Sequence, residues 1–272
     1  MGDSPLNPLV LIGVGSSFAF SGLFYHLYQE KKKELQKLKE IPLFKPDQHL
    51  VKVLKANAHK RLQYVAVEGV VQADGEPLSS RFVPRCFGVI QKIGQEENWK
   101  YWNSVTSTWD SRTTKKTETN NSVPFSLVNP ESYISDVSVK VHNPLEASGC
   151  FMERVYFKVK RAEEGLVDAV LQGLSGEKPG TRNETEELLC VGRTLTGFGE
   201  VVLEGDQVMR LQAPKNGRQY VLVPSDHRSF LDRHEASASM WKTLSTVTGI
   251  TGASLLTGVL YNLFNKQDDR SK

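Results

Sequence analysis

LVLIGVGSSFAFSGLFYHLY, residues 9–28, is a run of twenty residues without a formal charge. At about 1.5 Å per helical residue, its length matches a hydrocarbon core of roughly 30 Å. The charged run Glu30–Glu34 follows, and Tyr25 and Tyr28 stand where an aromatic belt is found. A cleaved signal peptide is the competing interpretation, but it requires a basic segment first, and only Asp3 and the amino terminus are charged there. We therefore predict a retained membrane anchor.

A second uncharged run, TLSTVTGITGASLLTGVLYNLF, occupies residues 243–264. It is rich in Gly, Ser and Thr, but hydroxyl groups in a membrane helix can donate to the carbonyl four residues earlier. A buried helix of a soluble protein would carry charges on one face, and this run has none. We predict a second span, which places both termini on one side of the bilayer and residues 29–242 on the other.

The distribution of charge does not determine which side of the bilayer residues 29–242 occupy. The flank 30–40 contains five Lys and three Glu, a net +2, so the positive-inside rule would keep it in the cytosol. That rule describes insertion by the translocon and weakens for a long loop, so the orientation stays open on charge alone.

Small residues recur every four positions in both runs. They are Gly13, Ser17 and Ser21 in the first run and Gly249, Ala253 and Thr257 in the second. Because this spacing permits close helix packing, it predicts self-association or pairing with longer relatives through the second set.

The composition of the chain excludes several classes of protein. Across 272 residues, 34 Lys+Arg against 31 Asp+Glu give +3, which is too balanced for a nucleic-acid binder. A mean hydropathy of −0.36 excludes a bundle of membrane helices. Cys86, Cys150 and Cys190 are far apart and form no CxxC pair. This excludes a disulfide scaffold and a Cys-rich zinc module, but leaves one bridge open.

Between the spans the hydrophobic period changes to two, which is typical of strands. The expected strands are 62–71, 82–93, 99–109 with 113–119 as its hairpin partner, 124–128, 136–141, 151–160, 188–195, 200–203, 208–211 and 220–223. Short helices are expected at 49–58 and 165–174. We predict an α+β protein with a β-rich middle domain flanked by two transmembrane helices. The expected divisions are a tail 1–8, a span 9–28, a helical stalk 29–60, a β-rich domain 61–224, a juxtamembrane helix 225–242, a span 243–264 and a tail 265–272.

Motifs that suggest catalysis fail on inspection. His234-Glu235 begins like a zinc-protease helix, but position 238 is Ala, so the second ligand is missing. Ser225-Asp226-His227 are sequence neighbours, and capping of the last helix explains them better than a triad. Gly197-Phe198-Gly199 lacks a third glycine and is interpreted as a turn. The six His have no ligand-like spacing. We therefore predict no catalytic, cofactor-binding or metal-ligating residue.

Two surface features remain. Trp99, Tyr101, Trp102 and Trp109 cluster in one expected hairpin, which indicates core packing or an exposed aromatic patch for a partner or membrane. The sequons Asn120-Asn121-Ser122 and Asn183-Glu184-Thr185 have meaning only if this region enters the secretory lumen.

The order of the motifs resembles one known family. After the first span come Val67–Val71, Cys86–Gln91, Trp102-Asn103, Thr108-Trp109, Val123–Val128, Ser175–Pro179, Glu184–Glu187, Val191–Glu200 and Leu211–Lys215, and a second span closes the series. From about Leu9 to Phe264 the chain resembles the mitochondrial ubiquitin ligase activator of NF-kappa-B family, also called MULAN, MAPL or GIDE.

The resemblance implies an outer mitochondrial membrane protein with two spans, a middle region in the intermembrane space and a cytosolic carboxy-terminal RING that carries the ligase function. It also implies ubiquitin and SUMO ligation in mitochondrial dynamics, mitophagy and signalling, with the peroxisome as a second location. The implied orientation opposes the charge count, and we follow the resemblance because the translocon rule need not govern this organelle.

The chain departs from the family at the RING. A RING needs eight Cys or His ligands around two zinc ions, and residues 265–272 contain neither residue type. We therefore expect a non-catalytic recognition module without a cofactor, held in the bilayer and binding protein partners through its middle domain. The alternative is a fragment of an active E3 ubiquitin-protein transferase whose RING lies beyond residue 272.

Overall fold

The computed structural model describes residues 8–130, 137–161, 177–205 and 208–268. The chain divides into a helical unit, residues 1–41 with 228–272, and a β unit, residues 42–227. The expected tails 1–8 and 265–272 and the expected helix 165–174 lie wholly or partly outside the described residues. The β-rich middle and the two flanking helices confirm the predicted α+β class.

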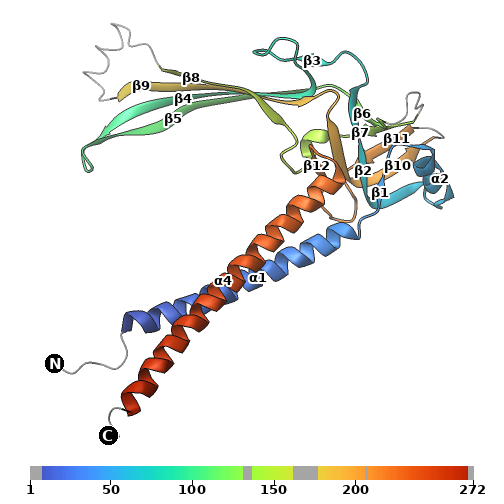
Figure 1. Cartoon of the computed structure of the whole chain (residues 1–272). Helices are drawn as coiled ribbons and strands as arrows, with labels where there is room; N and C mark the ends of the chain where they lie inside the picture. The colour runs from blue at the N-terminus through green and yellow to red at the C-terminus, as the bar shows by residue number, and fades with distance from the viewer. Residues whose placement is uncertain (1–7, 131–136, 162–176, 206–207, 269–272) are drawn as a thin grey trace. The chain divides into compact units, whose positions relative to one another are not determined.

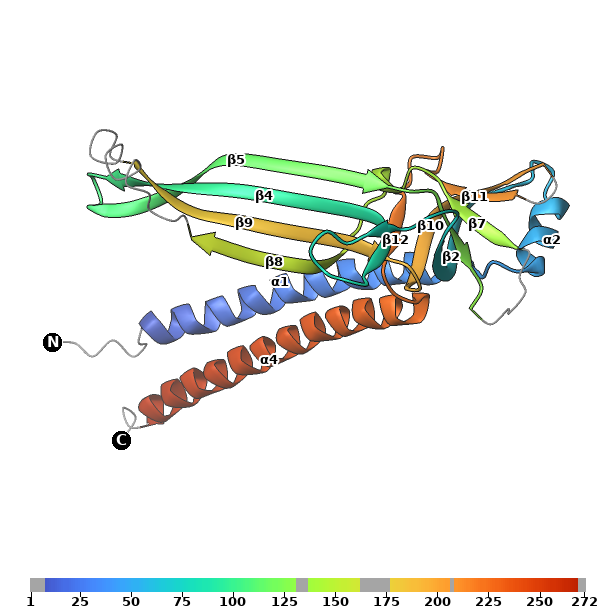
Figure 2. The ribbon, with the colours of Figure 1, turned by 90° about the horizontal axis from the view of Figure 1, so that it is seen from above.

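The helical unit consists of α1 (Pro8–Lys39) and α4 (His227–Asp268), which lie side by side (Figure 2). The start of α1 and the end of α4 lie at the same end of the pair (Figure 1). Both helices are long and apolar enough to cross a membrane, over Val10–Lys39 and His227–Tyr261. Neither helix breaks where its apolar run meets the charged flank, so the segments 29–39 and 227–242 continue the two runs as helix.

The β unit is built around a seven-stranded sheet. Its strands are β1 (Leu43–Phe44), β2 (Arg61–Ala73), β6 (Phe125–Val128), β7 (Ser138–Val141), β10 (Thr194–Glu204), β11 (Val208–Gln212) and β12 (Val221–Val223). Five of them close into a barrel in the order β2-β6-β7-β11-β10, because β10 also pairs with β2. Within this ring only β7 and β11 run parallel. This connectivity is that of an OB-fold, a five-stranded Greek-key barrel.

The barrel encloses the hydrophobic core. Side chains that alternate along the strands point inward, and the fully buried ones include Phe125, Leu127, Leu195, Met209, Leu211 and Leu222. The helix α2 (Gln48–Ala56) adds Leu50, Val51 and Leu54 to this core. Asp47 starts α2 by accepting a hydrogen bond from the Leu50 backbone N–H at 2.8 Å.

A second sheet of five strands is inserted into the barrel, and we call it the blade. It contains β3 (Leu78–Ser79), β4 (Phe87–Asn103), β5 (Thr108–Ser122), β8 (Glu153–Arg161) and β9 (Glu177–Cys190). The first three strands connect β2 to β6, and the last two lie between β7 and β10 (Figures 1 and 2). The short helix η1 (Pro144–Glu146) precedes β8.

Three local predictions were wrong. The expected hairpin turn between 109 and 113 lies instead between β4 and β5, where Asn103 pairs with Thr108. The expected strand 188–195 is two strands separated by a turn at Gly192, whose φ is +82°. Gly197 and Gly199 lie inside β10 rather than in a turn. A Cβ at Gly197 would stand 2.4 Å from Leu211 Cδ2, so any other residue there would force the Leu211 side chain to move.

Candidate partner-binding surface and membrane helix pair

The blade is long and solvent-exposed for most of its length. β4 pairs with β5 from Ile90–Ser122 to Asn103–Thr108 and with β9 from Gly88–Cys190 to Tyr101–Glu177 (Figure 2). At about 3.4 Å per residue, the 17 residues of β4 span roughly 55 Å. Among the residues of β5 whose side chains are described, none is buried. Cross-strand pairs and ladder hydrogen bonds therefore hold β5 in this sheet.

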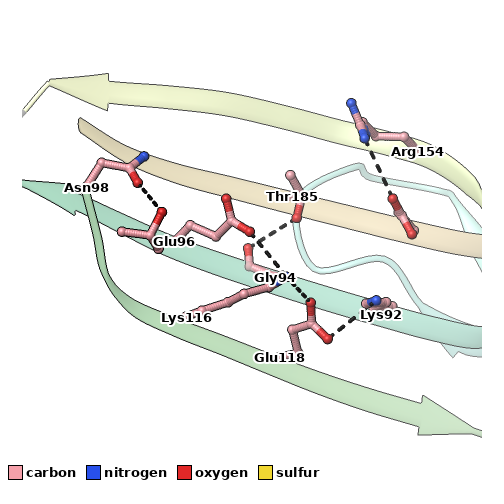
Figure 3. Close-up of polar contacts among 10 residues, drawn as sticks. Lys92, Gly94, Glu96, Asn98, Lys116, Glu118, Arg154 and Thr185 are labelled. Atoms are coloured by element: carbon pink, nitrogen blue, oxygen red, sulfur yellow. Dashed lines mark hydrogen bonds and ion pairs between the residues drawn. The ribbon is translucent and has the colours of Figure 1, made fainter. Parts of the chain in front are cut away.

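A chain of ion pairs runs across one face of the blade (Figure 3). Lys116 contacts Glu118 at 3.0 Å and Glu96 at 3.5 Å, and Lys92 contacts Glu118 at 3.4 Å. The hydrogen bond from Lys116 lowers the pKa of Glu118, and the same bond raises the pKa of Lys116. Because these groups are exposed, the network orders the surface more than it stabilises the fold.

The tip of the blade carries exposed apolar side chains. Trp102 and Trp109 are 48% and 43% exposed, and their rings meet edge to face with centroids 5.6 Å apart. Val105 in the turn is 92% exposed. Asn103 orders this turn, because its Oδ1 accepts from the Val105 backbone N–H at 3.0 Å and its Nδ2 donates to Asp110 at 2.8 Å. For Trp102 and Trp109 the structure therefore favours an exposed aromatic patch over core packing.

The base of the blade is organised by Glu186, which is 0% exposed. Its carboxylate accepts hydrogen bonds from Ser80 Oγ at 2.7 Å, from the backbone N–H groups of Arg81 and Phe82 at 2.9 and 3.2 Å, and from Gln91 Nε2 at 2.6 Å. Burial acts to raise the pKa of Glu186, but these hydrogen bonds outweigh it, and the pKa is lowered. The carboxylate therefore fixes residues 80–82 against β9.

Sequence reasoning did not single out Glu186 or Glu68. The carboxylate of Glu68, from β2, accepts a hydrogen bond from the backbone N–H of His227 at 2.8 Å. The sequence signal that could have indicated the burial of Glu186 is alternation. Glu184, Glu186 and Leu188 lie two residues apart on the same strand, and all three are buried. A carboxylate at an inward position of a strand needs partners, and a single sequence does not name them.

The sequon asparagines lie in strands of the blade, Asn120 in β5 and Asn183 in β9. Glu235, the second residue of the suspected zinc motif, pairs instead with Lys39 at 3.3 Å. Within the described ranges, no three His, Cys, Asp or Glu residues are grouped as metal ligands.

Reciprocal hydrogen bonds join the two long helices. Ser21 Oγ donates to the Ser245 carbonyl at 2.9 Å, and Ser245 Oγ donates to the Ser21 carbonyl at 3.0 Å. A Cβ at Gly249 would lie 3.1 Å from Ser21 Oγ, and one at Gly252 would lie 3.2 Å from Ser17 Cβ. Small residues thus allow close packing within the chain.

The rest of the predicted small-residue set faces outward. Ala253 and Thr257 are exposed, and Thr257 Oγ1 donates to the Ala253 carbonyl at 2.9 Å. Other hydroxyls of α4 also donate to the carbonyl four residues earlier, as expected for a helix of this composition, for example Thr251 to Val247 at 2.9 Å.

Comparisons with known proteins agree with this architecture. Residues 95–258 match the GIDE family, described as E3 ubiquitin ligase. The chain is 40% identical over 256 residues to the mitochondrial ubiquitin ligase activator of nfkb 1-A of Danio rerio, covering 94% of this chain and 73% of the relative. It is 36% identical over 265 residues to the mouse mitochondrial ubiquitin ligase activator of NFKB 1, covering 97% and 74%.

A more distant relative is the mitochondrial E3 ubiquitin protein ligase 1 of Drosophila melanogaster, 26% identical over 256 residues, covering 94% of this chain and 73% of the relative. No solved structure gives a significant match.

Two long apolar helices that bracket a barrel with an inserted blade define a membrane protein with a β-rich GIDE domain. The chain belongs to the mitochondrial ubiquitin ligase activator of NFKB family. The mitochondrial names of its relatives and its two apolar helices indicate a mitochondrial membrane protein.

Proposed function

We propose that residues 1–272 act as a recognition module of the outer mitochondrial membrane, which binds protein partners through the blade and does not itself transfer ubiquitin. The β domain lies in the intermembrane space and both helix ends point to the cytosol, with the peroxisome as a second location. The module serves ubiquitin and SUMO ligation in mitochondrial dynamics and mitophagy. The observation that carries this proposal is the blade, a long sheet with an exposed apolar tip at Trp102, Val105 and Trp109.

The position of the blade in the fold supports a binding role. In OB-folds, ligands bind at the loop between the first and second strands and on the neighbouring strands. In this barrel those two strands are β2 and β6, and the β3–β5 part of the blade connects them. The argument is one of fold analogy, and it assigns the surface rather than the partner.

Cross-linking in intact mitochondria tests the recognition role. A photo-reactive amino acid in place of Ser104, beside the exposed tip, should give discrete adducts with other proteins. The double change Trp102→Ser and Trp109→Ser should remove them, because the apolar contact area is lost. A matched control places the photo-reactive group at Lys52, on the exposed side of α2. Equal adducts from both positions, or adducts that survive the double change, would refute recognition by the tip.

Location and orientation have their own test. Sodium carbonate extraction should leave the chain in the membrane pellet. Added protease should leave the β domain intact in whole mitochondria and digest it after rupture of the outer membrane. Release by carbonate would refute the membrane spans, and digestion in whole mitochondria would refute the orientation.

A second function is an active E3 ubiquitin-protein transferase of which these residues are one part. The relatives favour this function, because they are named as a ubiquitin ligase or a ubiquitin ligase activator. They are also longer than the region that matches this chain. Reading the transcript past codon 272 distinguishes the two proposals, because an open frame that encodes CxxC pairs would support the second and a stop codon would oppose it. Purified residues 1–272 incubated with E1, E2, ubiquitin and ATP test the non-catalytic role itself. We expect no ubiquitin chains, and robust chain synthesis would refute the non-catalytic role.

Pairing between copies, or with longer relatives, is proposed to use Ala253 and Thr257, because Gly249 already packs within the chain. Changing both residues to Leu should reduce co-precipitation of two differently tagged copies. Ile250→Leu is the matched control, since Ile250 is 65% exposed on the same helix and the change conserves volume. Unchanged co-precipitation of the double variant would refute this surface.

A further inference from the structure

Two of the three cysteines meet at the base of the blade. Cys86 Sγ lies 4.0 Å from Cys190 Sγ, although the residues are 104 positions apart in sequence. Both side chains are half-buried, whereas Cys150 is exposed. Cys150 therefore serves as an internal control for the reaction of Cys86 with Cys190.

The strands hold these two thiols together. Cys190 is the last residue of β9 and pairs with Gly88 of β4, while the backbone N–H of Val191 donates to the Phe87 carbonyl at 3.1 Å. Cys86 precedes β4 directly, and its carbonyl accepts from the Ser80 N–H at 2.8 Å. Because the backbone is bonded on both sides, the thiols meet as a consequence of the sheet register.

Only a small movement separates the thiols from a bond. A disulfide has a sulfur–sulfur length of about 2.05 Å. Each sulfur has to move by roughly 1 Å to reach that length, a displacement of the size that rotation about the Cα–Cβ bond produces.

The pair is accessible to a small molecule. A cavity of about 440 Å³ is lined by Pro77, Arg85, Cys86, Phe87, Cys190 and Val191. This volume lies within the range of small-molecule sites, which is about 300–1,000 Å³. Both cysteines thus line a hollow through which a disulfide-bearing oxidant such as oxidised glutathione can approach.

We propose that Cys86 and Cys190 form an intramolecular disulfide by exchange with a disulfide oxidant, and that this bond fastens β4 to β9 at the base of the blade. The Cys86 thiolate attacks oxidised glutathione, forms a mixed disulfide and releases one glutathione thiolate. The Cys190 thiol then loses its proton to solvent and attacks the Cys86 sulfur, which releases the second glutathione. Two cysteine thiols are oxidised and one glutathione disulfide is reduced to two thiols.

The order of attack follows from the surroundings of Cys190. Burial and the adjacent Cys86 raise the pKa of Cys190 to about 11, so little of it is thiolate at neutral pH. Cys190 is therefore the second residue to react, when the mixed disulfide is held beside it.

Peptide mapping of the purified full chain in detergent tests the proposal. After incubation with oxidised glutathione and alkylation of free thiols, trypsin should release residues 86–92 linked to residues 183–193. Cys150→Ser, the matched control, should give the same linked pair. In Cys190→Ser, Cys86 should remain as a mixed disulfide with glutathione, whereas in Cys86→Ser Cys190 should stay free.

Three results of the peptide mapping would overturn the proposal. They are alkylation of both Cys86 and Cys190 after oxidation, a linked peptide that contains residues 141–154 with Cys150, and a wild-type chain that stops at the mixed disulfide. A bond between two copies would also overturn it, and non-reducing electrophoresis detects that bond as a dimer. The oxidised wild type should unfold at a higher temperature than its reduced form, and Cys86→Ser should show no such difference.

Discussion

The barrel and the blade use the same kind of strand for opposite purposes. Most residues of the barrel strands β6 and β10 are buried, and Leu127, Leu195 and Leu211 are 0% exposed. In the outer part of the blade, from Gln95 to Asn103 of β4, no described side chain is buried. The difference shows that the stability of the β domain is concentrated in the barrel, while the blade offers surface.

Buried and exposed carboxylates of the blade also differ in the groups that stabilise their charge. The buried carboxylate of Glu186, opposite Ile93 of β4, has four hydrogen-bond donors, whereas Glu118, opposite the next residue Gly94, is paired with lysines at the surface. Burial makes the first arrangement costly to disturb, and solvent makes the second nearly neutral. Four substitutions test this gradient.

The largest effect is expected in the core of the barrel. Leu127→Ala should lower the free energy of unfolding by about 2–5 kcal/mol, because it leaves a cavity among packed side chains. Val105→Ala at the tip is the matched control, and it should change the same quantity by less than about 0.5 kcal/mol. Chemical unfolding of the full chain in detergent measures both. Equal effects would remove the distinction between barrel and blade.

A tight contact inside the barrel should give the next largest effect. At Gly197 a new methyl group would lie 2.4 Å from Leu211 Cδ2 and 3.1 Å from Leu222 Cδ2, and both leucines are fully buried. Gly197→Ala should therefore destabilise the chain by about 1–3 kcal/mol through overpacking. Gly75 has no atom within 4 Å of the corresponding position, so Gly75→Ala should be stable in the same thermal assay. A stable Gly197→Ala variant would mean that the barrel is looser than described.

The sequence predicts the barrel better than the blade for a physical reason. Apolar and β-branched residues indicate burial, and barrel strands such as 62–71 and 124–128 contain runs of buried residues, which made them visible. β5 has no buried face to report, and its Thr-rich sequence hid the position of the turn. Glycines inside β10 resembled a turn because the close approach of Leu211 is a tertiary contact.

The membrane helices were the most predictable part, since length and lack of charge suffice to identify them. Their contact was not fully predictable. Spacing indicated Gly249, but the partner Ser21 and the contribution of Gly252 required the structure. The same holds for Glu186 and for the Cys86–Cys190 pair, because each joins residues about 100 positions apart.

A smaller, pH-dependent effect is expected at the base of the blade. Glu186→Gln keeps the shape of the side chain but removes the charge that its donors contact, so it should cost about 1–3 kcal/mol at pH 7. Because the pKa of Glu186 is lowered in the folded state, its contribution is present above the unfolded pKa of about 4.3. It should be lost as the pH falls below that value. Unfolding curves of wild type and variant should therefore converge toward pH 3, and a constant difference down to that pH would contradict the role of the charge.

The smallest effect should come from the exposed ion pairs. Glu118→Gln removes the shared partner of Lys92 and Lys116, but both lysines remain solvated and Lys116 retains Glu96. We expect no resolvable change in the unfolding midpoint at physiological salt, since exposed charges are screened over about 8 Å. Glu96→Gln is the matched variant, because it removes the other end of the same network. If either change destabilised the chain as much as Glu186→Gln, the ion pairs on the surface of the blade would contribute to folding, and these charges could no longer be interpreted as a surface kept free for a partner.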